Sequence, residues 1–173
     1  MNLKDYIPVV SDWPKPGVNF LDITGLLNEP RAFNEVCRWL SVQVKAANAT
    51  SIVAVESRGF IFASPIARAH ELPLVLVRKP NKLPGVVYTV TYDTEYSTDS
   101  LSIKADALVG ARPFIVDDLL ATGGTVLATA ELLRNNFNTE IINAAAVIGL
   151  DFLPGHNRLI QDKIDVHTLI NYA

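Results

Sequence analysis

Two adjacent carboxylates, Asp117 and Asp118, stand directly before a loop of very small residues in the stretch FIVDDLLATGGT, residues 114–125. The apolar residues ahead of them predict a strand, and a helical pattern follows the loop. Backbone N–H groups and the dipole at a helix N-terminus favour an anion, and small residues let the backbone approach it closely. We therefore expect a phosphate site in this loop, formed by Ala121, Thr122, Gly123, Gly124 and Thr125.

Asp117 and Asp118 require a different partner, because carboxylates repel a bare phosphate. Hydroxyl groups or a divalent metal suit them, and ligands of open α/β sheets bind beyond the carboxyl ends of the strands. A sugar 5-phosphate fits both halves of the pattern, with its phosphate in the loop and its diol on the acids. The alternative is that the two acids form only a strand-end pair that caps the following loop.

Composition and motif content exclude several other classes of protein. GxxxxGK[ST] and GxGxxG are absent, which excludes a Walker-type triphosphatase and the usual dinucleotide fingerprint. The formal net charge of -3 argues against a nucleic-acid partner. Cys37 is the single cysteine, and without CxxC or HExxH patterns a disulfide or zinc site is not expected. No apolar stretch reaches spanning length, so we expect a soluble, cytoplasmic protein with no membrane partner.

Alternating strand and helix patterns predict one α/β domain, residues 1–173, with a parallel sheet flanked by helices. Short apolar, β-branched runs predict buried strands at 51–57, 72–79, 113–118, 142–149 and 165–172. Helices are expected at 61–71, with Pro65 near the start, and at 125–136. A further helix is expected after Asn28 as N-cap, with one apolar face made of Phe33, Val36, Cys37, Leu40 and Val44.

Two segments lie outside this alternation. Residues 1–30 contain WPKPG, whose prolines disfavour regular pairing, and we expect an irregular arm that caps the domain. Residues 82–103 are rich in Val, Tyr and Thr with near period-two alternation but no continuous apolar face, which predicts two strands that project from the core. An excursion of this length is uncommon unless it is a lid or a binding loop.

Four segments of the chain resemble those of a known family. FIVDDLLATGGT is similar to the phosphoribosyl pyrophosphate (PRPP) signature of type I phosphoribosyltransferases. WPKPGVNFLDIT resembles the N-terminal hood of the adenine-specific members, ESRGFIFASPIA their first phosphate loop, and RKPNKLPG with YDTEYSTDSLSIKADAL their catalytic loop. The resemblance implies a parallel sheet flanked by helices, a small hood at 1–30 and a mobile β-lid at 82–103. It also implies a homodimer that pairs near the first phosphate loop.

The resemblance assigns PRPP to several segments. Asp117 and Asp118 would hold the ribose hydroxyls, directly or through Mg²⁺, and the loop 121–125 would hold the 5-phosphate. Ser57 and Arg58 would meet the pyrophosphate, beside a peptide that is often cis in this family. The departing pyrophosphate would be neutralised by three further cations, Arg78, Lys79 and Lys82. Taken without the resemblance, Arg58 reads as a strand-end charge and the three cations as a solvated face.

The implied reaction transfers the 5-phosphoribosyl group from PRPP to N9 of adenine and gives AMP and pyrophosphate, a step of purine salvage. Cations aimed at the leaving group stabilise the transition state, and closure of the site keeps water away from C1. Glu95 would act as general acid/base near the purine N7/N9 edge, Tyr96 would help to close the site, and Arg58 would complete the catalytic set. The alternative for Glu95 is a solvent-facing strand charge.

The base site departs from the family pattern. Asn19, Phe20 and Leu21 occupy the positions that would read adenine, and Leu21 stands where many members carry arginine. Backbone groups at Asn19 and Leu21 can still supply a donor and an acceptor, and Phe20 either stacks on the ring or belongs to the core. Asn81 and Ser97 stand where glycine is usual, and Gly149 replaces a common acid.

Three functions stay open on the sequence. The first is adenine phosphoribosyl transfer, and the second is the same chemistry on another 6-substituted purine such as hypoxanthine, whose donor and acceptor pattern is inverted. The third is a PRPP-binding regulatory module without catalysis. The presence of Glu95, Arg58 and the complete 114–125 signature counts against the third.

Overall fold

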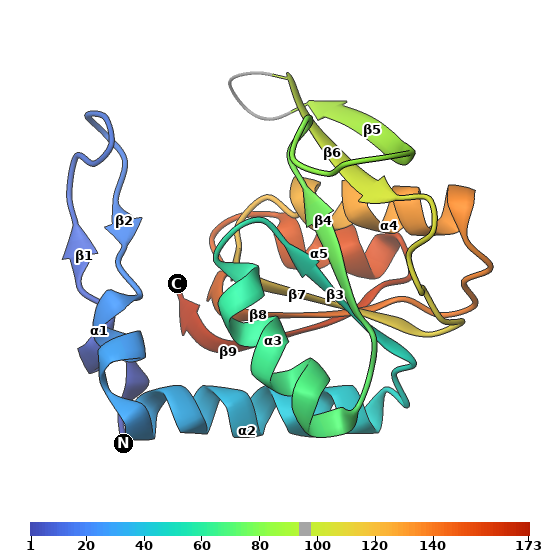
Figure 1. Ribbon diagram of the computed structural model, residues 1–173. Helices are drawn as coiled ribbons and strands as arrows, with labels where there is room; N and C mark the ends of the chain where they lie inside the picture. Colours follow the sequence, from blue (N-terminus) through green and yellow to red (C-terminus); the bar gives the residue numbers. More distant parts are fainter. Residues whose placement is uncertain (94–97) are drawn as a thin grey trace.

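A seven-stranded sheet forms the centre of the computed structural model, which describes residues 1–93 and 98–173 (Figure 1). The strands lie in the order β5-β6-β4-β3-β7-β8-β9. β4, β3, β7, β8 and β9 run parallel, whereas β6 is antiparallel to β4 and to β5. Their bounds are β3 Ser51–Val55, β4 Leu74–Arg78, β5 Val87–Asp93, β6 Thr98–Lys104, β7 Pro113–Leu120, β8 Asn143–Leu150 and β9 Asp165–Tyr172. The expected parallel sheet flanked by helices is confirmed.

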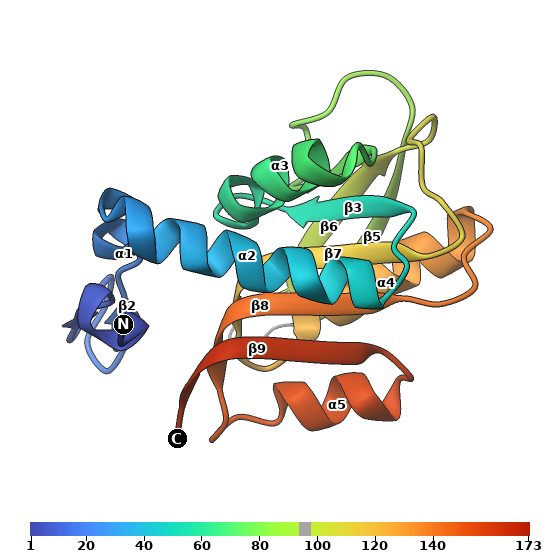
Figure 2. The ribbon, with the colours of Figure 1, turned by 90° about the horizontal axis from the view of Figure 1, so that it is seen from below.

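Helices cover both faces of this sheet (Figures 1 and 2). α2 (Pro30–Ala46) and α3 (Gly59–His70) pack on one face, and α4 (Gly124–Asn136) and α5 (Gly155–Gln161) on the other. Side chains alternate along each strand, so β3 serves two cores: Ile52 and Ala54 join the α2 and α3 side, and Val53 and Val55 the α4 side. β3 is therefore buried on both faces, as its apolar run predicts.

Several helix predictions need correction. The N-cap of α2 is Glu29, whose side chain accepts a hydrogen bond from the Arg31 amide at 3.0 Å, because Asn28 instead ends the short helix α1, Thr24–Asn28. Pro65 lies inside α3 rather than near its start, since that helix already begins at Gly59. The predicted apolar face of α2 is confirmed, because Val36, Leu40 and Val44 are buried together with Ala32, and the half-buried Phe33 and Cys37 pack against the same cluster. The short helix α5 was not predicted from the sequence.

Two strand predictions also differ. β7 does not end at the acid pair but continues to Leu120, because Leu119 and Leu120 pair with β8. β4 is not buried along its whole length: Val75 and Val77 are buried while Leu74 is exposed, since β6 pairs only with the end of this strand. Both differences arise from pairing between strands, which the local apolar pattern does not encode.

The N-terminal arm has regular structure where an irregular segment was expected. It contains a 3₁₀ turn at Leu3–Tyr6 and an antiparallel pair, β1 (Val9–Val10) and β2 (Phe20–Leu21), which stands beside the main body in Figure 1. WPKPG forms the turn between the two strands, closed by hydrogen bonds from Trp13 N to Val18 O (3.1 Å) and from Gly17 N to Asp12 Oδ1 (2.7 Å).

The 82–103 segment supplies β5 and most of β6, the expected pair of strands. The prediction that the pair projects from the core is wrong for β6, because Leu101 and Ile103 are buried in the cluster beneath α4. Within the described part of the chain, no helix has the length and hydropathy needed to cross a membrane.

Candidate functional site

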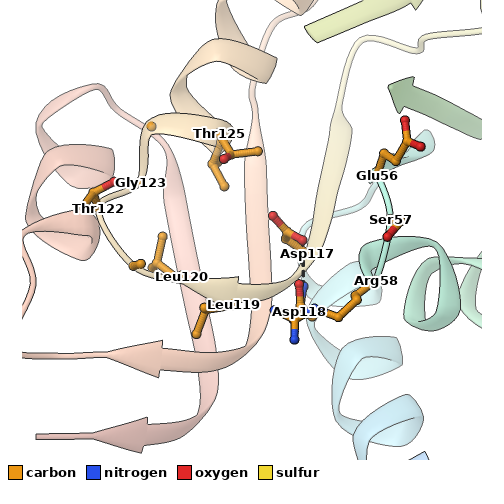
Figure 3. Close-up of a pocket in the computed structure, with 13 residues that line it drawn as sticks. Glu56, Ser57, Arg58, Asp117, Asp118, Leu119, Leu120, Thr122, Gly123 and Thr125 are labelled. Atoms are coloured by element: carbon orange, nitrogen blue, oxygen red, sulfur yellow. Dashed lines mark hydrogen bonds and ion pairs between the residues drawn. The ribbon is translucent and has the colours of Figure 1, made fainter. Parts of the chain in front are cut away.

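A cavity of about 300 Å³ lies at the carboxyl ends of β3 and β7 (Figure 3). β3 pairs with β4 on one side and with β7 on the other. The strand order therefore reverses direction between β3 and β7, and the cavity lies at this point. Crevices at such points bind ligands in open α/β sheets. Its lining consists of Glu56, Ser57, Arg58 and residues 117–126. The structure therefore brings the predicted acid pair, the small-residue loop and the Ser57–Arg58 turn together.

A close backbone approach places Arg58 in this cavity. A Cβ on Gly59 would lie 2.7 Å from the carbonyl oxygen of Val116, so only glycine lets α3 begin directly against β7. The Glu56–Ser57 peptide ahead of it is cis, as it often is in the family that the sequence resembles. Arg58 Nη2 lies 2.7 Å from Asp118 Oδ2, an ion pair between residues far apart in the chain.

The two acids carry most of the negative charge in the cavity. Asp118 is only 5% exposed, and Asp117 Oδ1 accepts a hydrogen bond from the Asp118 amide at 2.9 Å. Burial, together with the neighbouring Asp118 carboxylate, raises the pKa of Asp117 well above its ordinary value. Burial also raises the pKa of Asp118, although Arg58 opposes the shift. Such a pair favours a ligand that donates hydroxyl hydrogens or brings positive charge.

Unlike Arg58, the three other cations predicted for the pyrophosphate, Arg78, Lys79 and Lys82, do not line the cavity. Arg78 binds both carboxylate oxygens of Glu56, at 3.1 and 3.3 Å, and donates to the Lys82 carbonyl at 3.0 Å. Lys79 Nζ pairs with Asp99 at 3.1 Å, and the Lys82 side chain is exposed. Glu56, which the sequence analysis missed, therefore holds Arg78 beside the cavity. Its only signal was an acid immediately before Ser57.

Burial raises the pKa of Glu56, but the hydrogen bonds from Arg78 and from the Lys79 amide outweigh that effect and leave the pKa below its ordinary value. Glu56 is thus a carboxylate at neutral pH. It balances the charge of Arg78, which is available to an anionic ligand only if this pair rearranges.

The predicted base-reading residues meet the cavity through Arg58. Its Nη1 lies 3.5 Å from the Leu21 carbonyl oxygen, and its guanidinium carbon lies 5.1 Å from the centre of the Phe20 ring. The Leu21 side chain is buried in the core, so only its backbone can serve a ligand. Asn19 is exposed, and Trp13 packs edge-on against Phe20 with ring centres 4.4 Å apart.

The remaining departures from the family pattern are at Asn81, Gly149 and Ser97. Asn81 has φ +62°, a left-handed conformation that asparagine tolerates better than most residues, which explains why it can replace glycine. A Cβ on Gly149 would lie 2.8 Å from Asn171 Oδ1 and 3.0 Å from Thr168 Cβ, so an acid does not fit there without rearrangement. Glu95, Tyr96 and Ser97 lie outside the described residues.

Comparisons with known proteins agree with this arrangement. The phosphoribosyl transferase domain family matches residues 22–169. The adenine phosphoribosyltransferase of Parasynechococcus marenigrum is 47% identical, with 99% of each chain covered, and that of Serratia proteamaculans is 42% identical over 99% of this chain and 86% of the relative.

Solved structures extend the match to three dimensions. The adenine phosphoribosyltransferase of Thermoanaerobacter pseudethanolicus superposes with a TM-score of 0.89 at 40% identity, covering 98% of each chain. The enzyme of Saccharomyces cerevisiae, solved with an imino-altritol bisphosphate and adenine, gives a TM-score of 0.88 at 32% identity, covering 97% of this chain and 96% of that one. The chain therefore belongs to the adenine phosphoribosyltransferases, within the phosphoribosyl transferase domain family.

Proposed function

We propose that the cavity between β3 and β7 is the PRPP site of this enzyme. The reaction transfers the 5-phosphoribosyl group from PRPP to adenine and yields AMP and pyrophosphate, a step of purine salvage. One observation carries the assignment of the site: two adjacent carboxylates, that of Asp118 buried, and a helix N-terminal loop of small residues share a single cavity with Arg58. Of the three functions left open on the sequence, adenine transfer is the one that the relatives support.

The residues of the cavity divide the work of holding PRPP. The loop from Ala121 to Thr125 offers backbone N–H groups and two hydroxyls to the 5-phosphate at the start of α4. Asp117 and Asp118 accept hydrogen bonds from the ribose 2- and 3-hydroxyls. Ser57 and Arg58 lie on the opposite wall, where they meet the pyrophosphate and stabilise the charge that grows on it as it leaves.

Three further cations lie beside the cavity without lining it. Arg78 and Lys79 are held by Glu56 and Asp99, and Lys82 is exposed next to them. We assign them to the departing pyrophosphate, which competes with these carboxylates for the same positive charges. Charge-assisted hydrogen bonds to phosphate oxygens are strong enough to make that exchange possible.

The donor set also fits Mg²⁺. Among the described residues, no three carboxylate, histidine or cysteine side chains gather as a closed metal site, but the adjacent acids Asp117 and Asp118 offer two carboxylates to the cavity. Mg²⁺ commonly binds one or two carboxylates and completes its shell with substrate oxygens and water. When bound with PRPP, the ion would neutralise the pyrophosphate, and the two acids would hold it directly or through water.

For the base we propose the hood. Asn19 and Leu21 would read adenine through their backbone groups, and Phe20 would stack on the ring. The buried side chain of Leu21 supports this assignment, because the arginine of other members is not needed for backbone recognition. Glu95 and Tyr96 keep their expected roles as general acid/base and closing residue.

We also propose a cytoplasmic homodimer. Its contact would lie near the first phosphate loop, where the apolar side chain of Ile61 on α3 is 39% exposed. Size-exclusion chromatography with light scattering would give twice the monomer mass. Ile61→Asp is expected to shift that mass toward the monomer, and an unchanged dimer would move the interface elsewhere.

Pyrophosphate release by the purified enzyme tests the proposed site and the specificity together. Assays contain PRPP, Mg²⁺ and, separately, adenine, hypoxanthine, guanine or xanthine. We expect release with adenine alone and loss of PRPP binding in Asp118→Ala. Release only with another purine would overturn the hood assignment, and unaltered PRPP affinity in the variant would overturn the assignment of the cavity.

A further inference from the structure

The start of α5 packs against the small-residue loop, backbone on backbone. A Cβ on Gly155, the first residue of α5, would lie 2.1 Å from the Ala121 carbonyl oxygen and 3.0 Å from the Gly123 nitrogen. A Cβ on Gly123 would lie 3.1 Å from the Gly155 oxygen. The loop and α5 therefore form one closely packed unit, although α5 itself does not line the cavity. Thr122 and Gly123 mark this turn in Figure 3.

One side chain of α5 reaches the loop directly. Arg158 Nη1 donates a hydrogen bond to the Thr122 carbonyl oxygen at 2.7 Å. Leu159 beside it is fully buried in the core and anchors the helix, so the exposed Arg158 projects from a fixed base. A hydrogen bond from a charged donor is shorter and stronger than one between neutral groups.

This contact fixes the orientation of a peptide group at the centre of the loop. The Thr122 carbonyl and the Gly123 N–H belong to the same planar peptide, which is trans and points them in opposite directions. Gly123 has φ +80°, a conformation in which glycine has wide freedom, so the loop has little stiffness of its own at this position. A guanidinium that holds the Thr122 carbonyl therefore adds to the restraint that the Gly155 backbone places on the loop.

We propose that Arg158 is a positioning residue for the 5-phosphate of PRPP, acting through the Thr122 carbonyl to hold the phosphate-binding loop in its receptive conformation. The proposal rests on the proposed function of that loop as the phosphate site. Arg158 does not touch the substrate. Its removal weakens phosphate binding because the loop then has to be ordered by the ligand itself.

The test compares Arg158→Gln with Arg134→Gln. Arg134 is a matched control: it is also an arginine beside α5, it pairs with Asp162 at the end of that helix, and its hydrogen bonds go to Asp162 rather than to the loop. Both variants remove one positive charge from the same region. KM for PRPP, KM for adenine and calorimetric affinity for ribose 5-phosphate are measured for each variant, with Arg158→Lys as the conservative replacement.

We expect Arg158→Gln to raise KM for PRPP and to weaken ribose 5-phosphate binding by about tenfold, with KM for adenine unchanged. Arg158→Lys should recover part of the loss, and Arg134→Gln should show neither effect. If the two Gln variants have the same KM for PRPP and the same affinity for ribose 5-phosphate, the proposal is overturned.

Thr125→Val separates this failure from that of the proposed function. If Thr125→Val weakens ribose 5-phosphate binding while Arg158→Gln does not, the loop is the phosphate site and only the role of Arg158 is wrong. If Thr125→Val leaves that affinity unchanged, the loop is not the phosphate site, and the proposal for Arg158 fails with it.

Discussion

Among single residues, the negative charge of Asp117 lowers the stability of the folded protein. Asp117 sits beside Asp118 with a raised pKa, so the folded protein binds a proton there more readily than the unfolded chain does. Stability therefore falls as the pH rises from the ordinary value of 3.8 through the higher folded pKa, and the full penalty is present above it. Binding sites often carry such a penalty for function.

Asp117→Asn should remove this penalty and keep the oxygen that accepts the Asp118 amide. We expect the melting temperature of the ligand-free protein to rise by about 2–4 °C at neutral pH, the shift that roughly 1 kcal/mol produces in a domain of this size. The gain should vanish as the pH falls toward 3.8. PRPP affinity should fall in the same variant. A melting temperature that drops at neutral pH would show that the carboxylate is stabilised rather than strained.

Glu95 makes a different prediction, because its expected role is proton transfer rather than binding. Glu95→Ala should lower kcat by about a hundredfold or more and leave PRPP affinity nearly intact. Steady-state kinetics and calorimetry with PRPP separate the two quantities. Unchanged turnover would remove Glu95 from the mechanism.

The residue pattern predicted part of this site. Asp117, Asp118 and the loop after them are neighbours in sequence, so their spacing already describes a phosphate next to a diol. The pairs Arg58 with Asp118 and Arg78 with Glu56 each join the turn after β3 to another strand, β7 or β4. No local pattern specifies them, because they depend on which strands become neighbours in the sheet.

Among the elements, β5 touches the loop 121–125, the proposed phosphate site. The Tyr92 hydroxyl lies 3.4 Å from Thr125 Oγ1, and a Cβ on Gly124 would lie 3.5 Å from the Tyr92 ring. Tyr92→Phe should raise KM for PRPP by about threefold, the effect of one neutral hydrogen bond, without changing KM for adenine. Tyr88→Phe is the control, since it removes a hydroxyl from the same strand while the Tyr88 ring packs on Phe137. Equal constants in both variants would contradict a contribution from Tyr92.

Buried strands were predictable from their short apolar runs, and the long helices from their helical patterns. β9 matches its predicted range of 165–172, and α4 begins one residue before its predicted start. α5 was missed because it has seven residues, of which only Gly155 and Leu159 are buried, too few to establish a helical period. The antiparallel edge formed by β5 and β6 was recognised as a pair of strands, but its place in the main sheet depends on contacts between distant segments.

Across the whole molecule, Arg58 connects the N-terminal hood to Asp118, one of the two acids proposed to bind the ribose. It pairs with Asp118 on β7, contacts the Leu21 carbonyl and lies over the Phe20 ring, both on β2. Those two hood groups are the ones assigned to adenine. In the proposed site, adenine would compete with Arg58 for these two hood groups, and pyrophosphate would draw the guanidinium away from the hood. Binding of one ligand should then favour binding of the other, and the coupling is reciprocal.

Arg58→Ala should consequently bind adenine alone more tightly than the wild-type enzyme, by about fivefold, although it loses turnover with PRPP. Pyrophosphate with Mg²⁺ should tighten adenine binding to the wild-type enzyme but not to this variant. Arg78→Ala is the matched control, because Arg78 also pairs with a carboxylate and lies 5.9 Å from an aromatic ring, that of Phe60, on the main body. The affinity for adenine is measured by calorimetry for the wild-type enzyme and both variants. If Arg58→Ala binds adenine no more tightly than Arg78→Ala does, the guanidinium does not occupy the base site. Adenine would then bind to the hood independently of the ligand at Asp117 and Asp118.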